Sequence, residues 1–176
     1  MGYFLTEKAR IEQTDNPRYW KTLDNILYQD NEGTIYLVPR YFWSDGYSFP
    51  RILLSIFGNA YDVRPSYMHD LFCRFHECIK VTLSIEQLKS LGYLRVHEDK
   101  IVCENIPNCF LEILPITKWD CDCIFKRCML SCNISERLAE TIRFGVLFNF
   151  NWINTGKKSL LEFMLYKQDI GLINGY

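Results

Sequence analysis

Two short motifs between residues 42 and 70 carry side chains that could take part in acid–base, nucleophilic or metal chemistry. The first is a polar turn between aromatic residues, with Asp45 and Ser48 as its reactive groups. The second is the adjacent pair His69 and Asp70, inside a pattern that predicts a helix. Carboxylate, hydroxyl and imidazole groups serve general acid–base catalysis and metal ligation. Together the motifs predict a functional site without selecting its reaction.

The turn motif taken alone has a simpler interpretation. Aspartate starts turns by bonding to the backbone two residues on, and Gly46 supplies a positive φ, so Asp45-Gly46 is typical of an ordinary turn. Ser48 lacks the G-x-S-x-G surroundings of a hydrolase nucleophile. The prediction of a site therefore depends on the turn being considered together with His69 and Asp70.

A helix is predicted over Ser66–Ile79, after a proline suited to its first turn. Its face with the spacing H-x3-C-x2-H contains His69, Cys73 and His76, which could hold zinc. The alternative is a core thiol at Cys73 and a surface residue at His76. Neighbours on a helix cannot both face the core equally, so one of His69 and Asp70 is expected to point into a site or to bond a backbone group.

Asp122 lies beside the apolar face of a second predicted helix, Asp120–Ser131. A buried carboxylate needs a partner, because burying it unpaired is costly. His69 and Arg143 are the candidate partners. The sequence thus links distant helices to the first site.

Cysteines are frequent in the second helix and its flank, at positions Cys121, Cys123, Cys128 and Cys132. They could form a metal cluster, but their spacing differs from the C-x2-C pairs of structural zinc sites. Three of the four fall on the apolar stripe, which favours core packing.

The motif Asp45-Gly46-x-Ser48-x-Pro50, followed by His69-Asp70, resembles the phage- and prophage-encoded family called domain of unknown function 1353. Asp122 and Ile142-Arg143-x-Gly145 extend the resemblance, which covers residues 35–155 in pieces. It implies a phage or prophage context and a site without an assigned reaction. The chain departs from the family in a longer separation between Asp70 and Asp122, and in Leu71-Phe72 where a tyrosine is common.

A second resemblance concerns the same residues. A His-Asp pair on one helix with a later aspartate on another is similar to the metal-binding core of HD-type phosphohydrolases. That core also needs an upstream histidine, whereas His69 is the first histidine of this chain. Asp45 would have to take its place.

The order of elements, with strands early and helices late, predicts an α+β fold. One domain is expected over 1–176, with an N-terminal β-hairpin and the Asp-Gly turn packed on a C-terminal helical half. Residues 80–118 are expected to be an inserted helix and hairpin. Two hairpins are expected, one of Tyr19–Tyr28 with Thr34–Val38 and one of Tyr93–Val96 with Lys100–Cys103. The expected helices are a short apolar one at Arg51–Phe57, one capped by Ser84, and two late ones from Ser135 to Asn151 and from Lys157 to Lys167.

Composition limits the class of protein. The 176 residues are 48% hydrophobic, enough for a core, and the net charge of -1 gives no sign of nucleic-acid binding. The sequence has no signal-peptide pattern and no apolar run that would span a membrane. The eight cysteines are therefore expected to be free thiols in a reducing cytoplasm, that of a bacterial host.

Two functions are compatible with these patterns. In the first, the protein is a metal-assisted hydrolase. Asp45, His69, Asp70 and Asp122 converge on a divalent metal such as zinc, with His69, Asp70 and Asp122 as ligands, Ser48 bonding substrate and Arg143 binding. Phage context makes peptidoglycan or a nucleotide the substrate class.

In the second function, the protein is a non-enzymatic phage accessory protein, a virion-assembly factor or an inhibitor of a host defence. The polar residues are then a structural network. The aromatics Tyr41, Phe42, Trp43 and Tyr47 form the surface for a phage or host protein. The oligomeric state is left open by the sequence.

Overall fold

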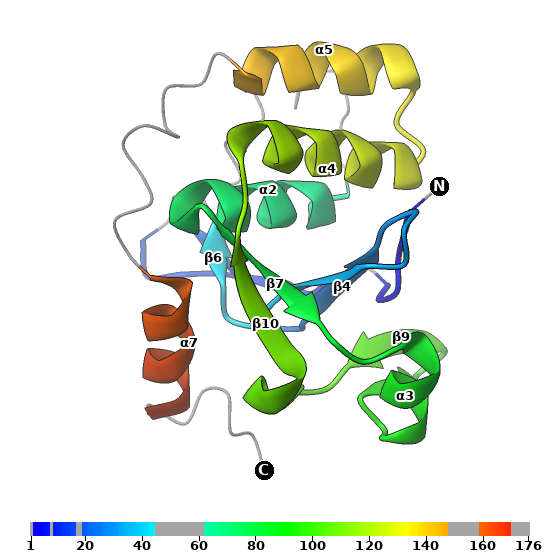
Figure 1. Ribbon diagram of the computed structural model, residues 1–176, viewed down its shortest axis with the longest axis vertical. Coiled ribbons are helices and arrows are strands. Elements are labelled where there is room, and N and C mark those ends of the chain that lie inside the picture. The colour runs from blue at the N-terminus through cyan, green and yellow to red at the C-terminus, as the bar shows by residue number, and fades with distance from the viewer. Residues whose placement is uncertain (1, 8, 17–18, 45–61, 148–158, 170–176) are drawn as a thin grey trace.

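The structure is a computed structural model that describes residues 2–7, 9–16, 19–44, 62–147 and 159–169 (Figure 1). Within these residues the chain combines antiparallel sheets with helices, which confirms the predicted α+β class. The Asp-Gly turn and the helix expected at Arg51–Phe57 lie outside the described residues, as does the end of the helix expected to reach Asn151.

The main sheet has five antiparallel strands in the order β1-β4-β5-β7-β10. In chain order these are β1 (Tyr3–Phe4), β4 (Ile26–Gln29), β5 (Ile35–Val38), β7 (Glu77–Val81) and β10 (Leu111–Pro115). The pairing of β4 with β5 confirms the predicted N-terminal hairpin, whose turn ends at Gly33 with φ 87°. Only glycine adopts that conformation at little cost.

Two smaller sheets accompany the main one. The first contains β2 (Ile11–Gln13), β3 (Trp20–Thr22) and β6 (Trp43–Ser44). The second is the hairpin of β8 (Leu94–His97) and β9 (Lys100–Cys103), which confirms the expected hairpin. The local sequence did not predict β1 and β2, each of which gains a ladder partner from a later part of the chain.

Three helices form successive layers over the main sheet, as Figure 1 shows. They are α2 (Arg64–Phe75), α4 (Lys118–Ser131) and α5 (Glu136–Leu147). The main core lies between α2 and the sheet, and a second apolar cluster joins α4 to α5. α4 is therefore buried on two sides, so a polar residue on either buried face must find its partner within the protein.

The helix predicted over Ser66–Ile79 is shorter than expected. It begins at Arg64 and ends at Phe75, because His76 adopts a left-handed conformation with φ 54°. Residues 77–81 instead form β7, a central strand paired on both sides, where the branched side chains of Ile79 and Val81 are buried. Tertiary pairing overrides the helical pattern here.

The segment 80–118 contains two kinds of structure. The short helix α3 (Ile85–Ser90) has the predicted capping box, in which Ser84 accepts from the backbone of Gln87. With β8 and β9 it lies at one end of the molecule (Figure 1). The 3-10 turn η2 (Asn108–Phe110) then leads into β10 of the main sheet. That 80–118 was inserted stays a prediction.

The last described element is α7 (Leu160–Asp169), in the region where a tail helix was expected. Leu160 and Met164 are buried in the main core. The backbone amide of Leu160 donates to the Glu77 carboxylate at 2.8 Å, which ties the start of α7 to β7.

Candidate metal centre

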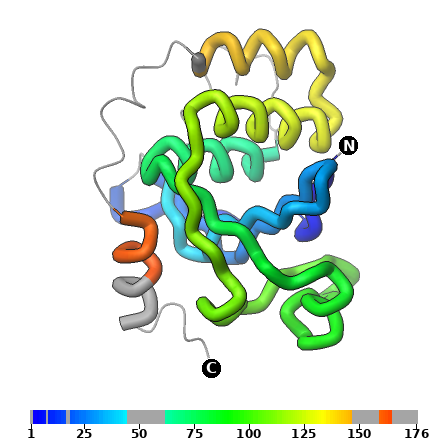
Figure 2. The backbone as a smooth tube through the Cα atoms, viewed as in Figure 1, coloured from blue at the N-terminus to red at the C-terminus, as the bar shows by residue number. Residues whose placement is uncertain are grey.

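The pairing of β7 with β10 brings the end of α2 beside the beginning of α4. Glu77 lies opposite Pro115 at the end of this ladder, and the amide of Ile116 donates to the carbonyl of His76 at 3.0 Å. Figure 2 shows the chain passing from α2 into β7 and from β10 into α4. The last turns of α2 therefore face the first turn of α4, although about fifty residues separate them.

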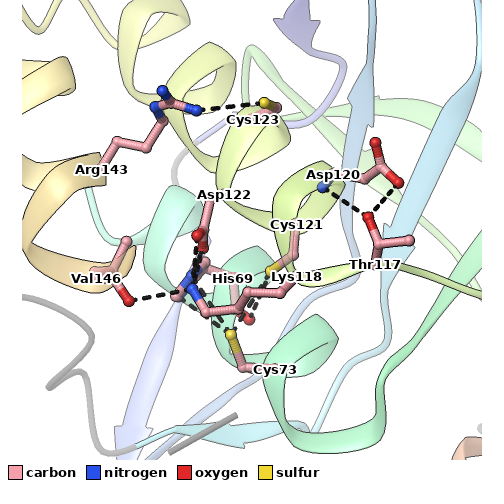
Figure 3. A network of polar contacts seen from close by, with 10 residues as sticks. All are labelled: His69, Cys73, Thr117, Lys118, Asp120, Cys121, Asp122, Cys123, Arg143 and Val146. Atoms are coloured by element: carbon pink, nitrogen blue, oxygen red, sulfur yellow. Dashed lines mark hydrogen bonds and ion pairs between the residues drawn. The ribbon is translucent and has the colours of Figure 1, made fainter. Parts of the chain in front are cut away.

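This junction assembles one histidine and two cysteines, His69, Cys73 and Cys121 (Figure 3). The Cys73 sulfur lies 3.4 Å from Nε2 and 3.8 Å from Nδ1 of His69. It lies 3.6 Å from the Cys121 sulfur, and one ligand atom from each residue falls within 4.8 Å of the others. Imidazole nitrogen and thiolate sulfur are the preferred ligands of zinc, so this group could hold a metal ion.

Asp122 adjoins the group and is fully buried. Its Oδ1 lies 3.1 Å from Nε2 of His69, which confirms one of the two predicted partners. Its other partner is Lys118, one turn earlier on α4, whose ammonium donates to both carboxylate oxygens at 2.6 Å and to the carbonyl of Val146 at 3.1 Å. The carboxylate thus has cationic donors where water is excluded.

Arg143 does not join this network, so its expected pairing with Asp122 was wrong. Its guanidinium donates to Glu140 at 3.0 Å and to the Cys123 sulfur at 3.6 Å, and it lies 4.7 Å from the centre of the Trp119 ring. Figure 3 shows the side chain directed toward Cys123 and away from His69. Glu140 lies three residues before Arg143 on α5, the favoured i, i+3 spacing, so Arg143 pairs with this nearby carboxylate.

One of His69 and Asp70 was expected to point into a site, and His69 does so, although both side chains are buried. His69 faces α4, where its ring stacks on Phe125 with centroids 4.4 Å apart. Asp70 faces β6 and accepts a hydrogen bond from the Ser44 hydroxyl. Because α2 lies between a strand and another helix, neighbouring positions can be buried against different partners. Asp70 is not one of the three grouped ligand residues.

The charges of this centre reinforce one another. A hydrogen bond with Cys121 and the charge of His69 lower the pKa of the Cys73 thiol to about 5, against the effect of burial. Burial alone would lower the pKa of His69, but the Cys73 charge and the bond to Asp122 raise it to about 9. Burial raises the pKa of Cys121 well above its ordinary value. The contact between the two side chains therefore favours negative charge on Cys73 together with positive charge on His69.

Sequence reasoning missed Cys121 and Lys118 as members of the site. Cys121 lay on the apolar stripe, and it is indeed buried, but its sulfur also meets Cys73. The signal for Lys118 was its i, i+4 spacing to Asp122 on one helix. His76, predicted on the zinc-binding face, instead occupies the left-handed cap of α2 and lies outside the described group. Asp45 and Ser48 lie outside the described residues.

The aromatic surface proposed for a protein partner is only partly present. Phe42 is fully buried beneath Tyr67 and Phe75, so it cannot meet a partner, whereas Trp43 is exposed at 39%. Tyr47 lies outside the described residues. All eight cysteines are described, and all are free thiols.

Comparison of the chain with known family models, with curated proteins and with solved structures gave no match. Among the described helices, none combines the length and the apolar character needed to cross a membrane. The site is therefore interpreted from its own geometry.

Proposed function

We propose that the protein binds zinc through His69, Cys73 and Cys121 and uses the ion for metal-assisted hydrolysis. The observation that carries this proposal is the distance of the Cys73 sulfur from the other two ligands, Cys121 and His69. A tetrahedral zinc with bonds of about 2.3 Å to sulfur and about 2.0 Å to nitrogen separates two sulfurs by about 3.8 Å, and sulfur from nitrogen by about 3.6 Å. The Cys73 sulfur lies 3.6 Å from Cys121 and 3.4–3.8 Å from the His69 nitrogens.

The surroundings of His69 support the same proposal. In a metal-bound histidine, the ring nitrogen that does not bind the metal commonly donates its hydrogen to a carboxylate. This hydrogen bond fixes the orientation of the ring and raises the basicity of the nitrogen that binds the metal. Asp122 contacts Nε2 and is itself held by Lys118, so Nδ1 is the nitrogen left for an ion. Stacking on Phe125 fixes the ring plane. The ligand is thus oriented before any metal arrives.

Three protein ligands are compatible with a catalytic ion. Structural zinc sites use four protein ligands, whereas catalytic sites use three and leave one position to water or substrate. The described residues supply three. Zinc at such a site lowers the pKa of a bound water and polarises a carbonyl or phosphoryl oxygen. A phage origin, and peptidoglycan or a nucleotide as substrate, are proposals that rest on the sequence resemblance.

The test is the metal content of purified protein and matched variants. Wild-type protein grown with zinc is expected to carry about one ion per chain, and H69A, C73S and C121S are expected to lose it. C123S is the control, because Cys123 lies two residues from Cys121 on the same helix and is outside the ligand group. Equal zinc in C121S and C123S, or no stoichiometric zinc in the wild type, would overturn the proposal.

A second candidate is a non-enzymatic accessory protein in which the same centre only fastens α2 to α4. The burial of His69, Cys121 and Asp122 favours it. Cobalt-substituted protein separates the two. An open coordination position predicts that added azide or thiocyanate changes the visible absorption of the cobalt. A closed structural site predicts an unchanged spectrum.

A further inference from the structure

A polar cleft of about 590 Å³ lies apart from the metal-binding residues and shares none of them. It is enclosed by the segment after β1, the β3–β4 and β5–β6 turns, and the β8–β9 hairpin. Sites for small molecules commonly measure about 300–1,000 Å³. The cleft is therefore large enough for a metabolite.

The walls of this cleft are fixed to one another by Asn25, which is 4% exposed. Its amide group donates to the carbonyl of Glu104 at 2.9 Å, and its carbonyl accepts from the backbone amide of Arg40 at 2.7 Å. A further wall is fixed by a hydrogen bond of 3.1 Å from the backbone amide of Glu7 to the carbonyl of Ile101. One buried side chain thus links three separate turns, so the cleft is formed before any ligand enters.

The backbone at the same cleft includes residues with positive φ. Five described residues other than glycine have positive φ; His76 and Asn133 follow helix ends, where that conformation is common. The other three are Tyr41 at 65°, Glu98 at 49° and Asp99 at 62°. Tyr41 and Glu98 line the cleft, and Asp99 completes the hairpin turn with Glu98. Positive φ at both residues is the ordinary conformation of a two-residue hairpin loop such as Glu98-Asp99, so Tyr41 is the unusual residue of the three.

Arg40 is one of the cations that line this cleft. Its guanidinium lies 4.5 Å from the centre of the Tyr41 ring and donates to the Tyr41 hydroxyl, while its buried Nε has no partner among the described residues. Arg10 differs, because Asp24 binds it through both oxygens at 3.0 and 2.6 Å. Lys100 lines the cleft and forms no ion pair within the described chain.

The acidic side chains of the cleft indicate which second charge its ligand carries. Glu7, Glu98 and Glu104 line the same cleft as Arg40 and Lys100, and no ion pair within the described chain neutralises them. A polyanion such as a nucleic acid would be repelled by these carboxylates. A small molecule with an anionic end and an ammonium end would satisfy both sets of charges.

We infer that the cleft binds a small zwitterion, with its carboxylate or phosphate on Arg40 and Lys100 and its ammonium group toward the glutamates. Two probes separate the anionic groups: γ-aminobutyrate carries a carboxylate, and phosphoethanolamine carries a phosphate. Titration of the full chain, followed by amide NMR, is expected to give saturable shifts around residues 23–25, 40–41 and 97–104 with at least one probe. The probe that binds more tightly identifies the anion.

The variant R40Q is expected to weaken that binding at least tenfold. The control arginine is Arg95, as R95Q, because it lies on the β8–β9 hairpin that also carries Lys100, but outside the cleft, where it donates to the Gly92 carbonyl. K100Q serves as a second variant if R40Q fails to fold, since Lys100 is an exposed residue. The inference would be overturned by unchanged binding in a folded R40Q or in K100Q, or by the absence of a saturable shift with either probe. It would also be overturned if acetate and ethylamine, which each carry one charge, bound as tightly as the zwitterionic probes.

Discussion

Replacing Lys118 with methionine tests whether the buried carboxylate of Asp122 depends on its ion pair. Lys118 is 22% exposed and Asp122 is fully buried, with their charged atoms 2.6 Å apart. Removing one partner of a buried pair costs about 3–5 kcal/mol, because the other charge is left uncompensated. His69 still contacts Asp122 at 3.1 Å, which reduces the expected loss in unfolding free energy to about 2–3 kcal/mol.

Lys126 supplies the matched control on the same helix. Its ammonium also lies 2.6 Å from a carboxylate, that of Glu140, but Glu140 is 32% exposed. Water can replace this partner, so K126M is expected to cause little or no loss. The two substitutions remove the same charge and the same donor group, and they differ chiefly in the burial of the carboxylate left behind.

The assay is urea unfolding of metal-free protein at pH 7, compared through its midpoint and slope. In a thermal melt of the same proteins, a loss of about 2–3 kcal/mol lowers the melting temperature of a chain of this size by about 4–12 °C. The double variant K118M/D122L is expected to recover part of the loss, because replacing both charges removes the unpaired carboxylate. Equal effects of K118M and K126M would refute the reasoning.

Three further predictions concern other parts of the chain. Arg64 holds the pKa of Asp62 below its ordinary value although burial opposes this, so the pair stabilises the fold above about pH 4 and the benefit is lost as pH falls through the folded pKa. D62N is therefore expected to flatten the acid limb of a melting curve measured from pH 6 to 2; an unchanged limb would contradict it. Mild oxidation of the metal-free protein is expected to join Cys73 to Cys121, whose sulfurs lie 3.6 Å apart, and zinc is expected to block the reaction, as seen by mass mapping. S44A removes a hydrogen bond to the buried Asp70 and is expected to cost about 1–2 kcal/mol in urea, whereas a neutral result would show that this bond contributes nothing.

Local patterns predicted much of the secondary structure because the causes of those elements are local. The Ser84 capping box, the turn ending at Gly33 and the β8–β9 hairpin each depend on residues that are close together in the sequence. The short strands β1 and β2 were missed because their ladder partners lie elsewhere in the chain. Strand β7 was read as helix for the same reason.

The sequence by itself determined which side chains needed partners. Asp122 on an apolar helix face had to be paired, and His69 was correctly identified as a partner. Helical spacing also placed Cys73 on the same face as His69. These conclusions follow from burial and periodicity, which are properties of each segment alone.

Only the tertiary structure decided what the site contains. The register of β7 against β10 sets the end of α2 beside the start of α4, and this placement alone brings Cys121 to Cys73 and Lys118 to the shared carboxylate. The same packing directs Asp70 toward Ser44 and leaves Arg143 with Glu140. Sequence spacing cannot supply these distances, because they arise from contacts between segments far apart in the chain.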